Sequence, residues 1–435
     1  MQNWQLAFRP SIKKQYRLRI SDRVCFDTMS MNYCQLTVDE ILVAKELDGQ
    51  SSISEIIKKL RGEKADIDII AIEIALDRLF WRGIIIGYFT SKIEKPKPII
   101  NIENGFIWPV NVLWSITNKC NFACLHCYAE SSITQVSPGH GILFKIARSI
   151  VNAGALAVTL TGGDPLLSPH FEEIVAYLNE KHIIVLLETN ATSINEKETQ
   201  VIKDYVSIVQ FSIFASEASL HDAFTGIDGS FEATIRKTKE LLQQNVVVML
   251  NYIYTNDDNG EFQKFLREYS QQVPFIKITP LESYGRARMI ESKCLSNKDI
   301  AILAIFVDKL RHQYQNIGMH LPYLKIKNGI FDKICCAGLS QCYIDSHGQV
   351  FPCEKLKVKA GAIDESSLSD IWTNSRALEI IRSRKPKESR KCGKCEYYLD
   401  CKGGCIAYCF NEQSLGESDV FDPVCEALGE IDRYE

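Results

Sequence analysis

The sequence lacks any long hydrophobic run. No stretch reaches the roughly 18 consecutive apolar residues that a membrane-spanning helix needs, and the first twenty residues contain no apolar core of a secretory signal peptide. These absences argue against an integral helical membrane protein and predict a cytoplasmic protein that has no membrane partner.

An excess of charge of either sign is also missing. The 435 residues include 50 Lys and Arg against 54 Asp and Glu, which gives a formal net charge of −4. Nucleic acids and anionic membranes attract proteins through a basic excess, so we expect no nucleic-acid partner. With 46% hydrophobic and 24% charged residues, the composition is that of a globular protein, and the length allows several domains.

Cysteine, by contrast, is abundant. The chain has 16 cysteines, and in a reducing compartment clustered thiols indicate metal or cluster ligands rather than disulfides. One group lies between Cys120 and Cys127, and a second, larger group spans Cys335 to Cys425. Isolated thiols without a partner at ligand spacing are expected to be packed in the core; they are Cys25, Cys34 and Cys294.

The first predicted domain comprises residues 1–92. A hairpin is expected at 22–37, followed by a helix that Thr37 caps and Gly49 ends. Further helices are expected at 55–62 and 67–83, and a closing strand at 84–89. This order predicts a winged-helix-like unit. Residues 93–109, which contain two prolines, are expected to form an extended linker.

Residues 110–320 alternate between apolar, β-rich runs and helical patterns. Six strands are expected, at 110–117, 155–163, 183–190, 206–214, 246–254 and 275–280. Continuous apolar strands that alternate with helices predict an α/β fold, here a partial (β/α)6 TIM-like barrel. Ligands bind at the carboxyl ends of such strands, where the polar sequences TNKC, TGGDP and ETN lie.

The strongest local signal is a C-x3-C-x2-C motif after the first of these strands. Cys120, Cys124 and Cys127 can bind three irons of a [4Fe–4S] cluster and leave the fourth iron open for a substrate. A zinc loop is the alternative, with His126 as a further ligand. Structural zinc sites, however, take four ligands in paired spacing.

This motif and the strands behind it resemble the radical S-adenosylmethionine (SAM) superfamily. The resemblance implies that the open iron chelates the methionine part of SAM, and that the reduced cluster cleaves SAM to a 5′-deoxyadenosyl radical. Gly162, Gly163 and Asp164 match the family's Gly-Gly-Glu-type motif, which binds the SAM amino group, with Asp in place of the more frequent Glu. A plain turn is the structural alternative for this tripeptide.

Further residues match SAM-contacting positions of the family more weakly. They are expected to approach the adenine, the ribose or the carboxylate, and each has a purely structural alternative: Tyr128, Glu188, Asn190, Ser212 and Arg286. The sequence assigns no catalytic base.

The C-terminal cysteines resemble the SPASM extension of radical SAM peptide-modifying enzymes, expected within residues 321–435 after a bridging region. The resemblance implies two auxiliary [4Fe–4S] clusters, and therefore three clusters in total. The ligands of auxiliary cluster I would be Cys336, Cys342, Cys353 and Cys405, and those of auxiliary cluster II would be Cys392, Cys395, Cys401 and Cys425. Cys335 and Cys409 are alternative ligands, and a zinc ribbon is the alternative for the pair at 392 and 395.

The N-terminal block resembles the PqqD-like element that recognises leader peptides of ribosomally made precursors. The resemblance implies that the leader adds a strand at the edge of the hairpin, a mode in which main-chain hydrogen bonds supply affinity. Val24, Phe26 and Tyr33 are the expected contacts. A winged helix also suggests DNA binding, but this block has no basic recognition helix.

Together these resemblances predict a radical SAM maturase that forms an intrapeptide cross-link in a ribosomal peptide. A thioether is favoured, with a carbon–carbon bond close behind. An external electron donor such as flavodoxin or ferredoxin is implied. The alternatives are an anaerobic sulfatase-type protein maturase and a non-catalytic iron–sulfur scaffold for peptide binding or electron transfer.

Overall fold

The computed structural model describes residues 11–12, 16–19, 24–27, 32–63, 67–81, 84–86, 106–319, 335–383, 394, 404–409 and 424. The chain divides into two compact units, residues 1–102 and residues 103–435. This division falls inside the segment 93–109 that the sequence marks as a linker. The finer domain bounds stay a prediction.

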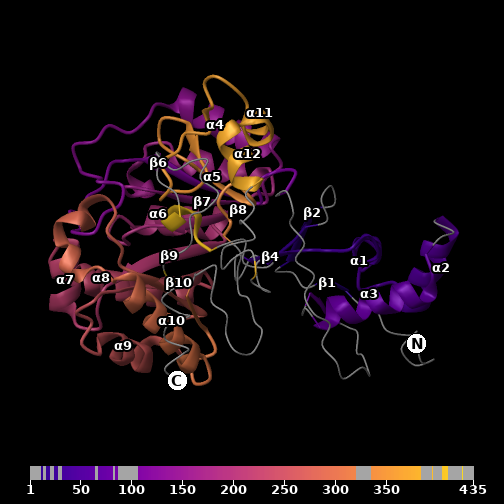
Figure 1. The fold of residues 1–435 in the computed structure, drawn as a ribbon, viewed down its shortest axis with the longest axis horizontal. Coiled ribbons are helices and arrows are strands. Elements are labelled where there is room, and N and C mark those ends of the chain that lie inside the picture. The colour runs from indigo at the N-terminus through magenta and orange to yellow at the C-terminus, as the bar shows by residue number, and fades with distance from the viewer. Residues whose placement is uncertain are drawn as a thin grey trace. The chain divides into compact units, whose positions relative to one another are not determined.

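The first unit is a small antiparallel sheet with three helices (Figure 1). Strands β2 (Tyr16–Arg19), β3 (Val24–Asp27) and β4 (Asn32–Gln35) form the sheet, with β3 in the middle. Helices α1 (Val38–Ala44), α2 (Ile53–Glu63) and α3 (Ile69–Trp81) follow, and the short strands β1 (Ser11–Ile12) and β5 (Ile85–Ile86) pair with each other. The elements have the expected order, while the winged-helix class stays a prediction.

Thr37 begins α1 as predicted, because it forms a reciprocal cap with Glu40. Its hydroxyl oxygen accepts a hydrogen bond from the Glu40 N–H at 3.2 Å, and the Glu40 carboxylate accepts one from the Thr37 N–H at 2.6 Å. The helices then bury one apolar face in a shared core, whose fully buried members include Val43, Ile53, Ile72 and Leu76.

The second unit is built on one ten-stranded sheet. Its order is β12-β11-β10-β9-β8-β7-β6-β13-β14-β15. The strands are β6 (Asn111–Thr117), β7 (Ala157–Gly162), β8 (Ile184–Glu188), β9 (Ile208–Ile213), β10 (Val247–Tyr254), β11 (Phe275–Pro280), β12 (Ile317–Met319), β13 (Gln341–Ile344), β14 (Gln349–Phe351) and β15 (Gly361–Ala362). Strands β6 to β12 are parallel, β13 is parallel to β6, and β14 and β15 are antiparallel to their neighbours.

All six predicted strands are present as β6 to β11, in a mostly parallel sheet of the partial-barrel type. The structure adds β12 and β13 to the parallel run. Neither was expected, because each has only three or four residues and such short runs give little periodic signal. β13 brings Cys342 next to β6, so the first part of the C-terminal cysteine region, from β13 to β15, belongs to the same sheet.

Helices pack against one face of this sheet (Figure 1). They are α4 (His140–Asn152), α5 (Phe171–Glu180), α6 (Glu196–Tyr205), α7 (Ala218–Thr225), α8 (Ser230–Gln243), α9 (Glu261–Tyr269), α10 (Asn297–Arg311), α11 (Leu368–Asn374) and α12 (Arg376–Arg382). The short helix α14 (Ile406–Cys409) packs in a separate cluster with Cys335 and Leu356. Two short 3-10 helices, η2 (Pro165–Leu167) and η3 (Gly285–Lys293), lie in loops.

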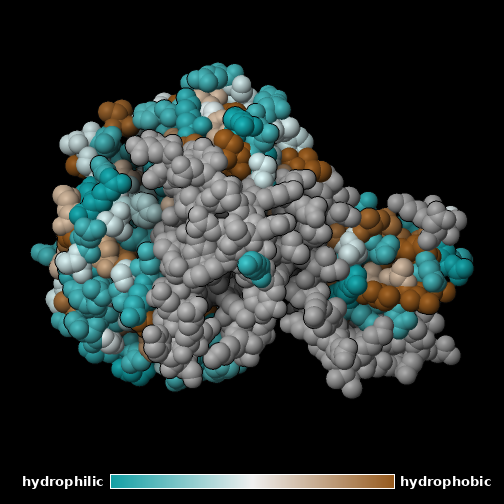
Figure 2. All heavy atoms as spheres, in the orientation of Figure 1, coloured by the Kyte–Doolittle hydropathy of each residue, from teal (hydrophilic) through white to brown (hydrophobic). Residues whose placement is uncertain are grey.

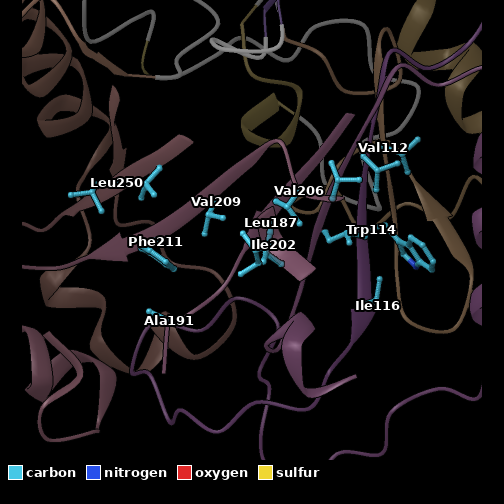
Figure 3. Packing of buried hydrophobic residues seen from close by; sticks show 14 of the residues in the cluster. Val112, Trp114, Ile116, Leu187, Ala191, Ile202, Val206, Val209, Phe211 and Leu250 are labelled. Carbon is cyan, nitrogen blue, oxygen red and sulfur yellow. The ribbon is translucent and has the colours of Figure 1, made fainter. Parts of the chain in front are cut away.

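The two faces of the strands differ in polarity. Alternate residues of β6, such as Val112, Trp114 and Ile116, are fully buried in the layer under the helices (Figure 3). Because strand side chains alternate, the residues between them point to the other face of the sheet. On that face lie hydrogen-bonding side chains, among them Asn111, Ser115, Thr159, Gln210, Asn251 and Thr279. A polar concave face is suited to binding a ligand.

Candidate functional site

The loop that follows β6 carries the first three cysteines. Neighbouring backbone fixes it in place: the Cys120 N–H donates to the Ser132 carbonyl at 3.1 Å, and the N–H groups of Ala123 and Leu125 donate to carbonyls at the end of α7 at 3.3 and 3.0 Å. The thiols of Cys120, Cys124 and Cys127 are all partly exposed. The loop therefore carries three partly buried thiols on a backbone that is anchored at several points.

The three thiols influence one another electrostatically. Burial, and then the charges of Cys120 and Cys127, raises the pKa of Cys124 to about 12. Burial also raises the pKa of Cys120 to about 11, although a hydrogen bond from the Phe122 N–H opposes this. Thiolates that repel one another in a buried place need a cationic partner.

This donor set fits an iron–sulfur cluster. Backbone N–H groups of Phe122 and Ser131 point at the sulfur atoms of Cys120 and Cys127, each at 3.4 Å. Such hydrogen bonds stabilise cluster sulfur ligands. In the part of the chain that the structure describes, no three His, Cys, Asp or Glu side chains are arranged for a single metal ion. A four-iron cluster differs because each thiolate binds its own iron.

Two of the predicted SAM-binding glycines occupy positions that no side chain could share. Gly162 has φ +133°, and a Cβ there would lie 2.1 Å from the Thr117 carbonyl oxygen. A Cβ on Gly163 would lie 2.1 Å from the Lys119 carbonyl oxygen. The glycine pair at the end of β7 therefore packs directly on the backbone that leads into the cysteine loop, which is more than a free turn requires.

Asp164 is completely buried and holds two strand ends together. Its carboxylate accepts hydrogen bonds from the Leu166 N–H at 3.0 Å, the Thr189 hydroxyl at 2.8 Å and the Asn190 N–H at 3.0 Å. Burial raises the pKa of this carboxyl, and the three donors oppose that rise. In this structure Asp164 acts as a positioning residue for the loops after β7 and β8.

Asn190 extends this network to the cysteine loop. Its side-chain N–H group donates to the Asn121 side-chain oxygen at 2.7 Å and lies 4.0 Å from the Cys120 sulfur. Its side-chain oxygen accepts from Thr192, whose hydroxyl also accepts a hydrogen bond from Asn121. The predicted ribose contact therefore lies beside the first cysteine.

The other interior residues lie on the polar face or at its rim. Tyr128 is beside Thr161, with the two hydroxyl oxygens 3.5 Å apart, and burial raises the pKa of its phenol. Glu188 accepts a hydrogen bond from Gln210 at 2.9 Å. Ser212 on β9 is half-buried and pairs with Asn251 on β10 in the strand register. The structure thus brings the predicted SAM residues to one end of the sheet.

Arg286 is fully engaged with the cysteine loop. Its Nε donates to the Cys124 carbonyl at 2.9 Å, its Nη1 donates to the Ser131 carbonyl at 2.8 Å, and its backbone N–H donates to the Cys127 carbonyl at 3.0 Å. Gly285 makes the approach possible, because a Cβ there would lie 2.5 Å from the Cys127 carbonyl oxygen. The Arg286 charge also lowers the pKa of Cys124. The sequence suggested that Arg286 contacts SAM. The structure shows in addition that Arg286 holds the cysteine loop through hydrogen bonds to its carbonyls.

The predicted auxiliary ligands are only partly within the described residues. Cys392, Cys395, Cys401 and Cys425, the set expected for auxiliary cluster II, lie outside them. The set for auxiliary cluster I is described: Cys342 is on β13, Cys353 follows β14, Cys405 directly precedes α14, and Cys336 precedes β13.

Within this group, Cys335 and Cys353 pack in one apolar cluster with Ile406, the residue that follows Cys405. Burial raises the pKa of Cys353, and Glu354, Cys335 and Cys405 raise it further. Cys335 therefore lies near Cys353 and Cys405, while spacing alone favours its neighbour Cys336. Burial raises the pKa of Cys342 to about 12, and the charge of Arg382 opposes this. Which of the two adjacent cysteines is a ligand stays open, and the side chain of Cys409 is not described.

A charged pair beside this second group was missed by sequence reasoning. Lys355 donates to the Glu282 carboxylate, and its Nζ lies 5.7 Å above the centre of the Tyr284 ring. The two residues are 73 positions apart, so no local spacing connects them. The only available signal was their place, Glu282 just after a strand and Lys355 two residues after a cysteine.

One expectation for the first unit needs correction. Val24 and Phe26 lie on β3, the middle strand of the β2-β3-β4 sheet, and the Val24 side chain is fully buried. They do not line an edge of the sheet, because β2 pairs with β3 on the side that was expected to be the free edge of the hairpin. Tyr33 is on β4, which is an outer strand among the described strands. The side chains of Phe26 and Tyr33 lie outside the described part.

The surface of this unit carries apolar side chains along α3 (Figure 2). Ile69, Ile70 and Ile74 are 38, 62 and 39% exposed. None of the helices in the described ranges combines the length and the apolar composition needed to cross a membrane.

Comparisons with known proteins agree with both cysteine groups. Residues 114–268 match the radical SAM superfamily, and residues 335–396 match the SPASM iron–sulfur cluster-binding domain. The AdoMet-dependent heme synthase of Nitratidesulfovibrio vulgaris is 26% identical over 74% of this chain and 94% of its own length. The mycofactocin maturase MftC of Mycobacterium tuberculosis is 26% identical over 72% of this chain and 82% of its own.

A solved structure shares the fold over more of the chain. The crystal structure of Streptococcus suis SuiB bound to its precursor peptide SuiA aligns with a TM-score of 0.66 and 17% identity, covering 96% of this chain and 100% of that chain. At this identity the likeness concerns the fold alone. Together with the cysteine loop, the glycine pair and the C-terminal thiols, these matches show a segment of the radical SAM type followed by a segment of the SPASM iron–sulfur type, and they support SAM and [4Fe–4S] clusters as cofactors.

Proposed function

We propose that this chain is a radical SAM maturase that forms a cross-link within a ribosomally made peptide. The observation that carries the proposal is the combination of the anchored three-thiol loop with a separate N-terminal unit of antiparallel strands. The relatives MftC and heme synthase align with less than three quarters of the chain. A unit of this kind is suited to holding a peptide by strand addition.

The leader of the precursor binds to the first unit as an added strand. β4 is the better site, since it is an outer strand among those described, whereas β3 is paired on both sides. The exposed isoleucines of α3 offer an apolar surface for leader side chains. The shared fold with SuiB over 96% of this chain supports this assignment.

The chain's own residues position and shield the reaction. Cys120, Cys124 and Cys127 hold the SAM-binding cluster, and Arg286 keeps their loop against the strand ends. The chemistry that the reduced cluster would supply to bound SAM is its cleavage to a 5′-deoxyadenosyl radical. Gly162 and Gly163 offer backbone to the SAM amino group, and Asp164 keeps that backbone in place through its buried hydrogen bonds. Tyr128, Glu188 and Ser212 form the polar wall for the remainder of SAM.

The product is a cross-linked peptide that is lighter by two hydrogen atoms, with a thioether favoured and a carbon–carbon bond next. The C-terminal cysteines hold two auxiliary clusters, for three in total. An external donor such as a flavodoxin or ferredoxin supplies the electron for SAM cleavage. The chain acts in the cytoplasm.

The test is mass spectrometry of a candidate precursor peptide after anaerobic incubation with the reconstituted enzyme, SAM and dithionite. Loss of two hydrogens supports the proposal, and fragmentation then locates the bond. Cys124→Ala serves as the matched control and is expected to leave the peptide unchanged.

Two other results would redirect the assignment. Release of 5′-deoxyadenosine with an aldehyde formed on a sulfatase-derived peptide would favour the protein-maturase alternative. No 5′-deoxyadenosine at all, with full iron content, would favour a non-catalytic scaffold and contradict the proposal.

A further inference from the structure

A charged pair lies between the two cysteine sites of the second unit. Glu282 lies two residues after the end of β11, and its side chain is 7% exposed. Lys355 lies two residues after Cys353, and its side chain is 32% exposed. Lys355 Nζ donates to the Glu282 carboxylate and lies over the Tyr284 ring at 5.7 Å from the ring centre. A partly desolvated pair of this kind has a strong local field.

The pair lies beside the auxiliary cysteines, because Cys353 packs in one apolar cluster with Cys335, with Leu356, which follows Lys355, and with Ile406, which follows Cys405. Burial and the charge of Glu282 raise the pKa of Tyr284 to about 12; Cys405 and Cys353 contribute to the rise, and Lys355 opposes it. Lys355 donates to the Glu282 carboxylate and follows Cys353 by two residues, so its positive charge lies beside this auxiliary site.

The same short segment also reaches the SAM site. Glu282 and Tyr284 are followed at once by Gly285 and Arg286, which bind the backbone of Cys124 and Cys127. Residues 282–286 thus contact the cysteine loop with one end and Lys355, beside the auxiliary site, with the other.

We propose that Lys355 and Glu282 form a charge pair that sets the reduction potential of the auxiliary cluster held by Cys353 and Cys405. Lys355 favours the reduced state, because one added electron makes the cluster more negative and a nearby, partly buried cation stabilises that charge. Glu282 limits this effect and fixes the position of the ammonium group. The proposal rests on the cluster assignment above and does not depend on which peptide is the substrate.

The test is a redox titration of the full-length, reconstituted protein, followed by electron paramagnetic resonance. Dithionite supplies one electron to each cluster, and no bond is made or broken. SAM identifies the signal of the first cluster by changing it, and the second auxiliary cluster serves as an internal reference. Lys355→Met is expected to make reduction of one auxiliary cluster about tenfold less favourable, a decrease of about 59 mV for one electron. Glu282→Gln is expected to shift the same signal upward.

Two further variants separate charge from structure. Lys355→Arg keeps the cation and is expected to restore most of the potential. Lys357→Met removes an exposed lysine that lies over the rings of Tyr343 and Phe351, and it is expected to leave all three potentials unchanged.

Clear outcomes overturn the proposal. They are an unchanged auxiliary potential in Lys355→Met at full iron content, or an equal shift of all three clusters. If the Lys355→Met variant loses iron, the Glu282→Gln variant provides the test. An unchanged potential of the auxiliary cluster in Glu282→Gln contradicts the proposal, and a raised potential supports it. Failure to modify a peptide would contradict the proposed function while leaving these potentials measurable.

Discussion

Each of the two cysteine sites has an arginine that lies near a thiol and binds backbone carbonyls. The two arginines differ in how much of the ligand set they hold. Arg286 binds the carbonyls of Cys124 and Ser131, on the loop that carries all three SAM-cluster cysteines. Arg382 binds the carbonyls of Gly338 and Trp372 at 2.8 and 2.5 Å, and its guanidinium lies 4.3 Å from the centre of the Trp372 ring. The first arginine holds a complete ligand set, whereas the second supports only part of one.

The difference follows from how each site is assembled. Cys120, Cys124 and Cys127 lie on one loop, so one contact orients all of them. Cys342 and Cys353 come from β13 and from the end of β14, and Cys405 comes from a segment more than fifty residues further on. The first site is therefore expected to depend on single residues of its loop, and the second on the packing of several elements.

The largest expected effect is at the first site. Cys124→Ala removes the thiol whose pKa is raised to about 12 by burial and by its two cysteine neighbours, and with it one of three iron ligands. We expect SAM cleavage to be abolished, because the two remaining thiols leave one iron of the cluster without its thiolate ligand. The measurement is 5′-deoxyadenosine formation under reducing conditions. Leader binding, measured by fluorescence anisotropy, should stay intact, and a loss there would contradict the separation of the two functions.

The two arginines give the next largest effect and the most direct contrast. Arg286→Ala removes two charge-assisted hydrogen bonds to the loop, each worth about 1.5–3 kcal/mol, so we expect iron to leave the first cluster at least about tenfold faster. Arg382→Ala removes the same number of bonds from the auxiliary region but leaves Cys353 and Cys405 in place. We expect a lower melting temperature with a smaller change in iron release.

Iron release to a chelator distinguishes the two arginine variants when SAM is used to identify the first cluster. Arg288→Ala, which changes an exposed arginine of the same short helix, is the matched control for Arg286. Equal rates of iron loss from both sites in the two variants would contradict the difference in assembly.

Acid is expected to weaken the support of the first site. His221 on α7 is buried, its Nδ1 accepts a hydrogen bond from the Phe214 N–H at 3.3 Å, and burial lowers its pKa to about 4. The folded protein accommodates the neutral imidazole of His221 and disfavours its protonated form. The contribution of His221 to the free energy of unfolding is therefore complete above its ordinary pKa of about 6.5, and it is lost as the pH falls towards 4. This loss amounts to about 3 kcal/mol.

Chemical denaturation at several pH values measures this effect. His221→Gln should flatten the dependence between pH 6.5 and 4 relative to the unaltered protein. Since the carbonyls at the end of α7 bind the cysteine loop, the unaltered protein should also lose iron from the first cluster faster at the lower pH. An unchanged pH dependence in the variant would assign the acid sensitivity to other groups.

The same contrast explains what could be predicted from the sequence. The apolar runs that became β6 to β11, the Thr37 cap and the three-cysteine loop are local patterns, and the structure contains each of them. β12, β13 and the third strand β2 of the first unit are short, and their pairing depends on distant partners. For this reason the edge assignment of Val24 and Phe26 failed.

Within the candidate sites, residue types were easier to predict than roles. Asp164 was expected at the SAM amino group, which stays a prediction, and the structure adds that its buried carboxylate binds the loops after β7 and β8. Glu282 and Lys355 were not singled out, because an ion pair between residues 73 positions apart leaves no pattern in the chain. The choice between Cys335 and Cys336 is of the same kind, since spacing favours one and proximity to Cys353 favours the other.

The smallest predicted effect tests how finely the first site is tuned. The Asn190 side-chain N–H group lies 4.0 Å from the Cys120 sulfur and also binds Asn121 at 2.7 Å. A donor at that distance contributes weakly to a thiolate, so Asn190→Ala should lower the reduction potential of the first cluster only slightly and change iron content little. Asn190→Asp puts a negative charge at the same place and should lower the potential more. A larger effect of Ala than of Asp would show that Asn190 acts through the shape of the loop, and the first site would then resemble the second in depending on packing.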